Sequence, residues 1–330
     1  MKRSGILAAG NWIVDHVKMI DQYPQQDALV SITSKSDSNG GGPYNVLKDL
    51  SRLGVTFPLY GAGLVGDDPD GAWILADCAS HGINRSQIAS CDAPTSYTDV
   101  MTVSGDGRRT FFHQRGANAL FDGRDVLFVD SPKIFYLGYL LLLDALDQVG
   151  TDGSTPATKL LGRASTAACL TAVDLVSDQE GEFRKVVTPA LPHTDVLFLN
   201  EYEAGRLLDE DFSSCDRDDL LAAADEIKSM GVRRLVVIHR ADGAAAVGEG
   251  ERLWQGSVKV PEDQIAGAVG AGDAFAAGML FGLHEDLPLT ECLRQAVCSA
   301  ALCLTEPTTS GGMRPMAEAL DFGADHGFRL

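Results

Sequence analysis

The segment GAVGAGDAFAAGML, residues 267–280, places four glycines and one aspartate at the start of an alanine-rich stretch. A glycine-rich turn that leads into a helix leaves unpaired backbone N–H groups aimed at one point, with the positive end of the helix dipole behind them. Glycines also let a ligand approach the backbone closely. The segment therefore predicts a helix whose amino end binds an anion.

Asp273 suggests what this anion site does. A carboxylate is a poor ligand for an anion, but it is a suitable base for a hydroxyl group that lies beside the anion. This pairing favours phosphoryl transfer, in which the backbone amides of Gly270, Ala271 and Gly272 stabilise the transferred group while Asp273 takes the acceptor's proton. The same residues are also compatible with a tight turn in which Asp273 only caps the helix. The segment lacks the Gly-Lys-Ser/Thr of a Walker loop.

Length and composition narrow the class of protein. A chain of 330 residues with 45% hydrophobic and 22% charged residues has the material for one large α/β domain. Its net charge of −19 argues against nucleic acid or an anionic membrane surface as the main partner. The amino-terminal apolar run is too brief for a signal sequence or a membrane span, which favours a cytoplasmic protein. The seven cysteines, an odd number, are interpreted as reduced core residues.

Short apolar runs alternate with helical patterns along the chain. Runs such as GILAAG (residues 5–10) and DVLFLN (residues 195–200) predict buried strands, and TPATKLLGRAST (residues 155–166) predicts a helix. This alternation predicts a mostly parallel sheet covered by helices on both faces. Residues 12–35 and 95–114 break the rhythm, and the second of these segments alternates polar and apolar residues around a Gly-Asp-Gly hairpin turn. We predict a single domain, residues 1–330, into which these two segments insert a small discontinuous β lid.

The glycine-rich segment resembles the second signature of the PfkB carbohydrate kinases, the ribokinase-like family, usually written Asp-Thr-x-Gly-Ala-Gly-Asp. Other landmarks follow in the family's order: Gly40, Gly41 and Asn45 fit the first signature, Gly-Gly-x-x-x-Asn, and Asn200 and Glu203 fit an Asn-x-x-Glu motif. The resemblance covers about residues 5–312. It implies a three-layer ribokinase-like fold with a β lid and an enzyme that phosphorylates a sugar hydroxyl with ATP and Mg²⁺.

The resemblance also implies which residues bind the acceptor. An aspartate at the end of the first strand grips the sugar in this family, and it aligns with Asp15. The glycine amides and asparagine of the first signature, here Gly40, Gly41 and Asn45, complete the grip. Charge-assisted hydrogen bonds from a carboxylate suit a polyhydroxy acceptor. Arg115, where the lid meets the core, is a further candidate for a substrate phosphate or hydroxyl.

On the nucleotide side, the resemblance implies that Asn200 and Glu203 organise the water shell of a Mg²⁺ ion that bridges the ATP phosphates, since Mg²⁺ prefers oxygen ligands and keeps several waters. Gly272 belongs to the turn that meets the transferred phosphate. The nucleotide strand of the family, Thr-Leu-Gly-x-x-Gly, reads IHRADG here, so Arg240 replaces a glycine near the phosphates and Gly243 is kept. This arginine either clashes with ATP or donates to its phosphates.

Other departures from the family pattern concern the cation and the acceptor. Gly267 and Ala268 stand where the family has Asp-Thr, and in many relatives that aspartate helps to hold a monovalent cation, which leaves a dependence on K⁺ open. Ile13 replaces an asparagine that hydrogen-bonds the sugar in ribokinases, which argues against plain ribose. Asp174 follows the pattern of a residue at the carboxyl end of a strand, where it either meets a ligand or caps a turn.

Three functions agree with these residues. The leading prediction is a kinase for a small sugar or sugar derivative. The second keeps the chemistry but takes a nucleoside as the acceptor, which an apolar Ile13 and a nearby Trp12 would tolerate. The third is a sugar-binding or regulatory protein with weak or no turnover, suggested by the departures from the family pattern at Gly42, Arg240, Gly267 and Ala268. A homodimer through an apolar face of the lid is also expected. The sequence leaves the identity of the acceptor open.

Overall fold

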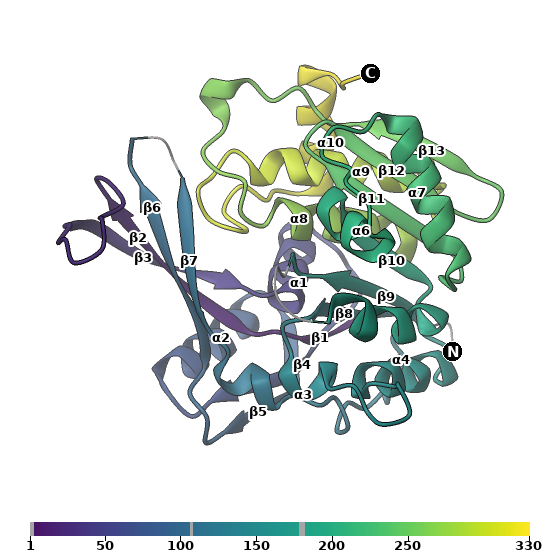
Figure 1. Cartoon of the computed structure of the whole chain (residues 1–330), viewed down its shortest axis with the longest axis horizontal. Coiled ribbons are helices and arrows are strands. Elements are labelled where there is room, and N and C mark those ends of the chain that lie inside the picture. The colour runs from purple at the N-terminus through teal and green to yellow at the C-terminus, as the bar shows by residue number, and fades with distance from the viewer. Residues whose placement is uncertain (1–2, 106–107, 178–181) are drawn as a thin grey trace.

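The computed structural model describes residues 3–105, 108–177 and 182–330, and these residues form two sheets (Figure 1). The strands of the large sheet are, in spatial order, β13 (Arg252–Gly256), β12 (Gly243–Val247), β11 (Leu235–Arg240), β10 (Val196–Asn200), β9 (Leu170–Leu175), β8 (Ile134–Leu140), β1 (Ile6–Gly10), β4 (Leu59–Gly66) and β5 (Ile83–Cys91). The strands from β11 to β5 are parallel, and β12 and β13 add an antiparallel edge. The predicted mostly parallel sheet is confirmed.

Helices cover both faces of the large sheet. One face carries α1 (Gly42–Arg52), α2 (Pro69–Ser80), α8 (Ala271–His284), α9 (Leu289–Cys303) and α10 (Met316–His326). The other carries α3 (Asp144–Asp147), α4 (Pro156–Thr166), α5 (Phe183–Val187), α6 (Glu201–Leu208) and α7 (Arg217–Ser229). Short 3₁₀ helices lie at η1 (Gly116–Leu120), η2 (Thr188–His193) and η3 (Glu262–Gln264).

The apolar strands are buried because the sheet has a hydrophobic core on each face. Successive side chains of a strand point to opposite faces. In β1, Ile6 and Ala8 accordingly join the core under α1, α8 and α9, whereas Leu7 and Ala9 join the core under α4 and α7. A strand buried on both faces is therefore a continuous apolar run rather than an alternating pattern. This is the three-layer arrangement expected from the sequence.

The small sheet projects from this body as a lid (Figure 1). Its strands are, in spatial order, β3 (Ile32–Gly40), β2 (Ile13–Ile20), β6 (Ser96–Val103) and β7 (Arg109–Gln114). Only β2 and β6 pair in parallel, and β3 continues to Gly40, past the predicted end of the first lid segment. Two residues of the predicted hairpin turn, Asp106 and Gly107, lie outside the described residues. The assignment of the whole chain to one domain stays a prediction.

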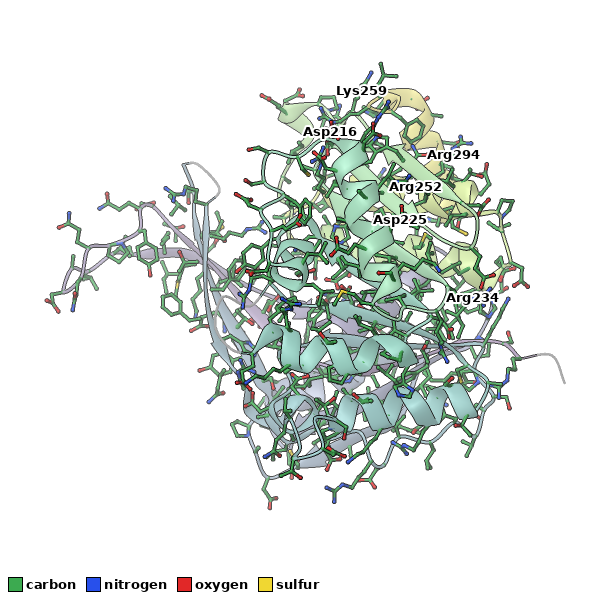
Figure 2. All side chains as sticks on the ribbon, turned by 45° about the vertical axis from the view of Figure 1, so that its right-hand side comes forward. Asp216, Asp225, Arg234, Arg252, Lys259 and Arg294 are labelled. Atoms are coloured by element: carbon green, nitrogen blue, oxygen red, sulfur yellow. The ribbon has the colours of Figure 1, made fainter. Side chains whose placement is uncertain are left out.

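The order of the strands indicates where the sheet is expected to bind a ligand. From β1 the chain builds β4 and β5 on one side and β8 to β11 on the other, so the direction of the strand order reverses between β1 and β8. Ligands of open α/β sheets bind at the carboxyl ends of strands at such a point. Arg234, which directly precedes β11, lies on the side of the molecule away from the lid (Figure 2), so the lid lies toward the carboxyl ends.

No helix of the described residues is long and apolar enough to cross a membrane.

Candidate active site

Asp273 lies in the first turn of α8, which begins directly after Gly270. Gly270 has φ of +80°, a left-handed conformation that favours glycine, and a Cβ atom there would lie 2.8 Å from the carbonyl oxygen of Thr309. Because the first backbone N–H groups of a helix have no partner within it, the amides of Gly272 and Asp273 are placed to bind an anion. The structure therefore forms the turn that the glycines predict.

The carboxylate of Asp273 is held by two other elements. Its Oδ2 accepts a hydrogen bond from Nδ2 of Asn45 in α1 (2.8 Å), and its Oδ1 accepts one from the hydroxyl of Tyr139 in β8 (2.6 Å). The residue is only 6% exposed. Gly270, not Asp273, is the N-cap of α8, so the alternative in which Asp273 merely caps its helix has no support.

The acceptor-binding residues predicted from the first signature lie next to Asp273. Gly40 ends β3 against the carboxylate of Asp15, since a Cβ atom at Gly40 would lie 2.6 Å from Oδ1 of that aspartate. Gly41 has φ of +89°, and a side chain there would collide with the carbonyl oxygen of Asn11. The structure thus brings Asp15, Gly40 and Asn45 together around Asp273.

Burial sets the protonation of the two aspartates. It raises the pKa of Asp273 to about 6, against the opposing hydrogen bonds from Tyr139 and Asn45. Burial likewise raises the pKa of Asp15 to about 7. A hydrogen bond with Thr98 opposes this rise, and the negative charge of Asp273 adds to it. A carboxyl group with a pKa near 6 is mostly ionised at neutral pH and is still basic enough to take a proton. Asp273 therefore has the properties of a general base.

Several polar residues of this site were missed by the sequence analysis. Asn39 donates to Oδ1 of Asn45 (2.7 Å) and to the hydroxyl of Ser310 (2.9 Å), which fixes the amide that Asn45 presents to Asp273. Tyr139 lies inside the apolar run of β8, so only the pairing across 134 residues of sequence reveals its role. Such contacts leave no periodic signal in one sequence.

Asp174 lies at the carboxyl end of β9, close to the same cluster. Its Oδ2 accepts a hydrogen bond from the hydroxyl of Tyr136 (2.9 Å). Burial raises its pKa well above the usual range, and the charges of Asp273 and Glu203 add to the effect. Asp174 is thus close enough to both Asp273 and Glu203 for their charges to favour its protonated form.

The Asn-x-x-Glu motif forms a capping box at the start of α6. Oδ1 of Asn200 accepts from the backbone N–H of Glu203 (2.8 Å), and Oε2 of Glu203 accepts from the backbone N–H of Asn200 (2.9 Å). The hydroxyl of Ser177 donates to Oε1 of Glu203 (2.8 Å). Both carboxylate oxygens are thus hydrogen-bonded within the protein, and the described residues contain no cluster of three or more acidic, His or Cys side chains that could hold a metal ion. Oxygen atoms arranged in this way fit Mg²⁺ that is bound through water better than direct ligation.

A cavity of about 690 Å³ extends from the amino end of α8 toward β11 and β12. Its polar end is formed by Asn200, His239, Arg240 and Gly272, and Gly243 also lines it. The residues of its apolar wall are Val258, Val260, Ile265, Phe275, Val297, Ala301 and Leu304. A polar end at the anion-binding turn and an apolar wall further away suit a nucleotide, whose phosphates and base have these two characters.

Arg240 is held at the edge of this cavity by protein groups. Its guanidinium pairs with the carboxylate of Asp242, with one contact of 2.8 Å, and NH1 donates to the carbonyl oxygen of Cys215 (2.8 Å). The hydrogen bond with Asp242 raises its pKa. These bonds turn the charged end toward Asp242 and Cys215, which explains how an arginine fits where the family has glycine.

Arg115 lies elsewhere. Its NH1 donates to Oδ1 of Asp144 (2.6 Å), and it lines a separate pocket of about 510 Å³ with Leu141 and Asp147. Trp12 is fully buried and donates from Nε1 to the carbonyl oxygen of Ala62 (3.0 Å), so it packs in the core. The structure therefore does not group these two residues with Asp15 and Asp273.

Comparisons with known proteins agree with this geometry. A family model described as pfkB family carbohydrate kinase matches residues 8–315. An ATP-dependent ribose-1-phosphate kinase from Halopiger xanaduensis is 26% identical over 320 residues, which cover 96% of this chain and 96% of that protein.

Solved structures show the same fold. The structure of Arabidopsis thaliana ribokinase complexed with ribose and ATP matches with a TM-score of 0.78 at 21% identity, covering 98% of this chain and 99% of that one. Ribokinase from Giardia lamblia matches with a TM-score of 0.82 at 18% identity, covering 99% and 100%. With the family model matching nearly the whole length, the resemblance seen in the sequence is confirmed, and the chain belongs to the PfkB family of carbohydrate kinases.

Proposed function

We propose that this carbohydrate kinase transfers the terminal phosphoryl group of ATP to a hydroxyl of a small sugar or sugar derivative, with Asp273 as the general base. The observation that carries the proposal is the position of Asp273: it is buried at the amino end of α8, bonded to Asn45 and Tyr139, and close enough to Asp15 to raise its pKa. A base and an anion-binding turn thus share one point of the site.

In this mechanism Asp15 accepts hydrogen bonds from hydroxyls of the acceptor and fixes the reacting hydroxyl near Asp273. The hydroxyl oxygen forms a bond to the γ-phosphorus, its proton passes to the carboxylate of Asp273, and the bond to the leaving oxygen of ADP breaks. In the turn at residues 270–273, the amides of Gly272 and Asp273 stabilise the charge on the phosphoryl oxygens. The hydrogen bonds from Asn45 and Tyr139 keep the carboxylate oriented throughout.

The cavity beside α8 suits ATP, and the structure of the Arabidopsis thaliana relative contains ATP and ribose. Asn200, Glu203 and Ser177 would hold Mg²⁺ through water, and the ion would supply positive charge to the phosphates. Glu203 is 4% exposed and fixed by its capping box, so its position is set before any ligand binds.

The acceptor is proposed from the pocket and the relatives together. Ile13 begins β2 beside the site and offers no hydrogen bond, which argues against a pocket identical to that of a ribokinase. Trp12 is buried in the core and therefore does not supply a surface for a nucleoside base. The match to a ribose-1-phosphate kinase over 96% of both chains favours a pentose or pentose phosphate.

We further propose that two copies associate through the lid. Ile32, Phe111 and Phe112 lie on lid strands and are 53%, 54% and 51% exposed, which is unusual for large apolar side chains. A second copy packed on one face of the lid would cover Phe111, whereas Phe112, the next residue of β7, points to the opposite face. Light scattering tests this: Phe111→Ser should lower the molar mass toward that of one chain, whereas Leu120→Ser, at a side chain exposed outside the lid, should not.

The experiment that tests the kinase is ATP consumption with a panel of pentoses, hexoses, their phosphates and nucleosides, with Mg²⁺ and with or without K⁺. Turnover with a sugar or sugar phosphate is the expected result. Selective turnover with a nucleoside would show that the acceptor is a nucleoside rather than a sugar. Sugar binding without consumption of ATP would instead show a binding or regulatory protein.

A further inference from the structure

Arg109 is a lid residue that reaches the loops around the amino end of α8. It begins β7, and its NH2 donates to the carbonyl oxygen of Pro307 (3.3 Å), in the segment that follows α9. A Cβ atom at Gly267 would overlap the same nitrogen. The guanidinium therefore lies against the backbone of Gly267, three residues before the left-handed Gly270 that starts the anion-binding turn.

The charge of Arg109 acts on the acceptor side as well. It lowers the pKa of Asp15, opposing the effect of burial, so the guanidinium and this carboxyl interact across the site. Burial lowers the pKa of Arg109, which a guanidinium tolerates without losing its proton. In a chain of net charge −19, this places a permanent positive charge between the acceptor-binding carboxyl and the turn that meets the phosphoryl group.

Gly267 is what leaves room for this arginine. The backbone of Gly267 is not in the left-handed region, so a larger residue fits its conformation, but any side chain would compete with the guanidinium for the same space. The bond to Pro307 engages one of the five N–H donors of the guanidinium, and the planar fork suits a phosphoryl oxygen as a further partner.

Resting on the proposed function, we propose that Arg109 is a catalytic residue of the kinase reaction. Its bond to the carbonyl oxygen of Pro307 fastens β7 of the lid beside the loop that leads from Gly267 into the anion-binding turn, and its guanidinium supplies positive charge to the phosphoryl group during transfer. Gly267 and Arg109 form one functional pair, because the absence of a side chain at Gly267 lets the guanidinium approach. The pair makes the lid part of the phosphoryl-binding machinery as well as part of the acceptor pocket.

The first test compares Arg109→Ala, Arg109→Lys and Lys35→Ala with the unmodified enzyme, using the best acceptor of the panel. Lys35 is a matched control because it is an exposed lid cation that pairs with Asp37 on the same strand (3.6 Å). Arg109→Ala should lower kcat and kcat/KM together by about 10- to 100-fold, as expected for charge felt mainly in the transition state. Arg109→Lys should retain an intermediate kcat, and Lys35→Ala should match the unmodified enzyme.

The second test uses Gly267→Ala. The new methyl group should displace the guanidinium and reproduce most of the loss seen in Arg109→Ala. In the double variant the methyl group has nothing left to displace, so Gly267→Ala should add little to Arg109→Ala. Thermal unfolding of all four proteins checks that the fold is kept.

Each of three results would overturn the inference. The first is an Arg109→Ala enzyme that is as active as Lys35→Ala, and the second is a double variant in which the losses of the two single variants multiply. The third is a raised KM for the acceptor at unchanged kcat in Arg109→Ala, which would make Arg109 a ligand of an anionic group on the acceptor. An unmodified enzyme that turns over no member of the panel would refute the proposed function itself, and the role of Arg109 with it.

Discussion

The two halves of the site are built in opposite ways. We call Asn45, Tyr139 and Asp273 the floor: they come from α1, β8 and α8, and their side chains are bonded to one another across 228 and 134 residues of sequence. The lid is a four-stranded sheet whose Phe111 and Phe112 are half exposed. The floor is thus fixed by buried hydrogen bonds between distant segments. The lid has such bonds where β3 joins the body, as from Asn39 to Ser310, but its outer strand β7 is largely exposed.

This difference separates chemistry from recognition. A hydrogen bond to a buried charge contributes more free energy than an exposed ion pair, because removing one partner leaves the other without water. The floor therefore holds the base in one orientation, which proton transfer requires. The lid supplies Asp15, and an acceptor can bring its own hydroxyls to that carboxyl. We expect changes in the floor to act on kcat and changes in the lid, with the exception of Arg109, to act mainly on acceptor binding.

Asp273→Asn should have the largest effect. The amide cannot take a proton, so kcat should fall by about 10³-fold or more, while the dissociation constant of the acceptor changes little. Single-turnover kinetics and calorimetric titration with the acceptor measure the two quantities separately. Loss of acceptor binding together with turnover would show that Asp273 serves the fold of the floor rather than the chemistry.

Asp15→Asn should have the second largest effect, and this effect should be on KM for the acceptor rather than on kcat. Replacing the carboxylate weakens its charge-assisted bonds to the acceptor hydroxyls, so KM for the acceptor should rise by about 10- to 100-fold. The KM for ATP should stay close to that of the unmodified enzyme. An equal loss in kcat would mean that lid and floor do not divide the work as the structure suggests.

The sequence predicts those features of the floor and the lid that depend on short local motifs. The helix start at residues 270–273, Asn45 in the first signature and the alternating lid strands each leave a short pattern, and the structure has the elements they predict. Tyr139 and Arg109 leave no such pattern, because their roles depend on partners far away in the chain. Arg115 shows a second limit of local motifs: a sequence does not show which nearby acid an arginine will meet, and here it is Asp144.

Tyr139→Phe should change the pH dependence more than the maximal rate. The hydrogen bond from Tyr139 lowers the pKa of Asp273, so its loss should raise that pKa above about 6 and move the acid limb of kcat/KM to higher pH. Because the base must be ionised, activity should drop about 2- to 10-fold at pH 6 and less at pH 8. Tyr136→Phe is the matched control, since its hydroxyl donates to Asp174. If the acid limb of the pH profile does not shift in Tyr139→Phe, a group other than Asp273 produces that limb.

The smallest effect is expected on stability, from a residue next to the floor. Asp49 lies one turn below Asn45 in α1, is fully buried, and neither of its carboxylate oxygens has a well-formed hydrogen bond among the described residues. Burial raises its pKa well above the usual range. The folded protein therefore holds this proton more tightly than the unfolded chain does. The stability that this proton contributes is fully present below about pH 4, the ordinary pKa of the group, and is lost as the pH rises toward the folded value.

Asp49→Asn removes this dependence because an amide does not ionise. Its free energy of unfolding should exceed that of the unmodified protein by about 1–3 kcal/mol at pH 8, and the difference should shrink or reverse at pH 4.5. Asp77→Asn is the control of opposite sign: burial raises the pKa of Asp77, but hydrogen bonds from Lys48 and Tyr44 outweigh it and lower the pKa below the ordinary value. That variant should be less stable at pH 8. Urea unfolding at both pH values measures these free energies. If Asp49→Asn is less stable than the unmodified protein at pH 8, the buried carboxyl stabilises the folded protein at that pH instead of destabilising it.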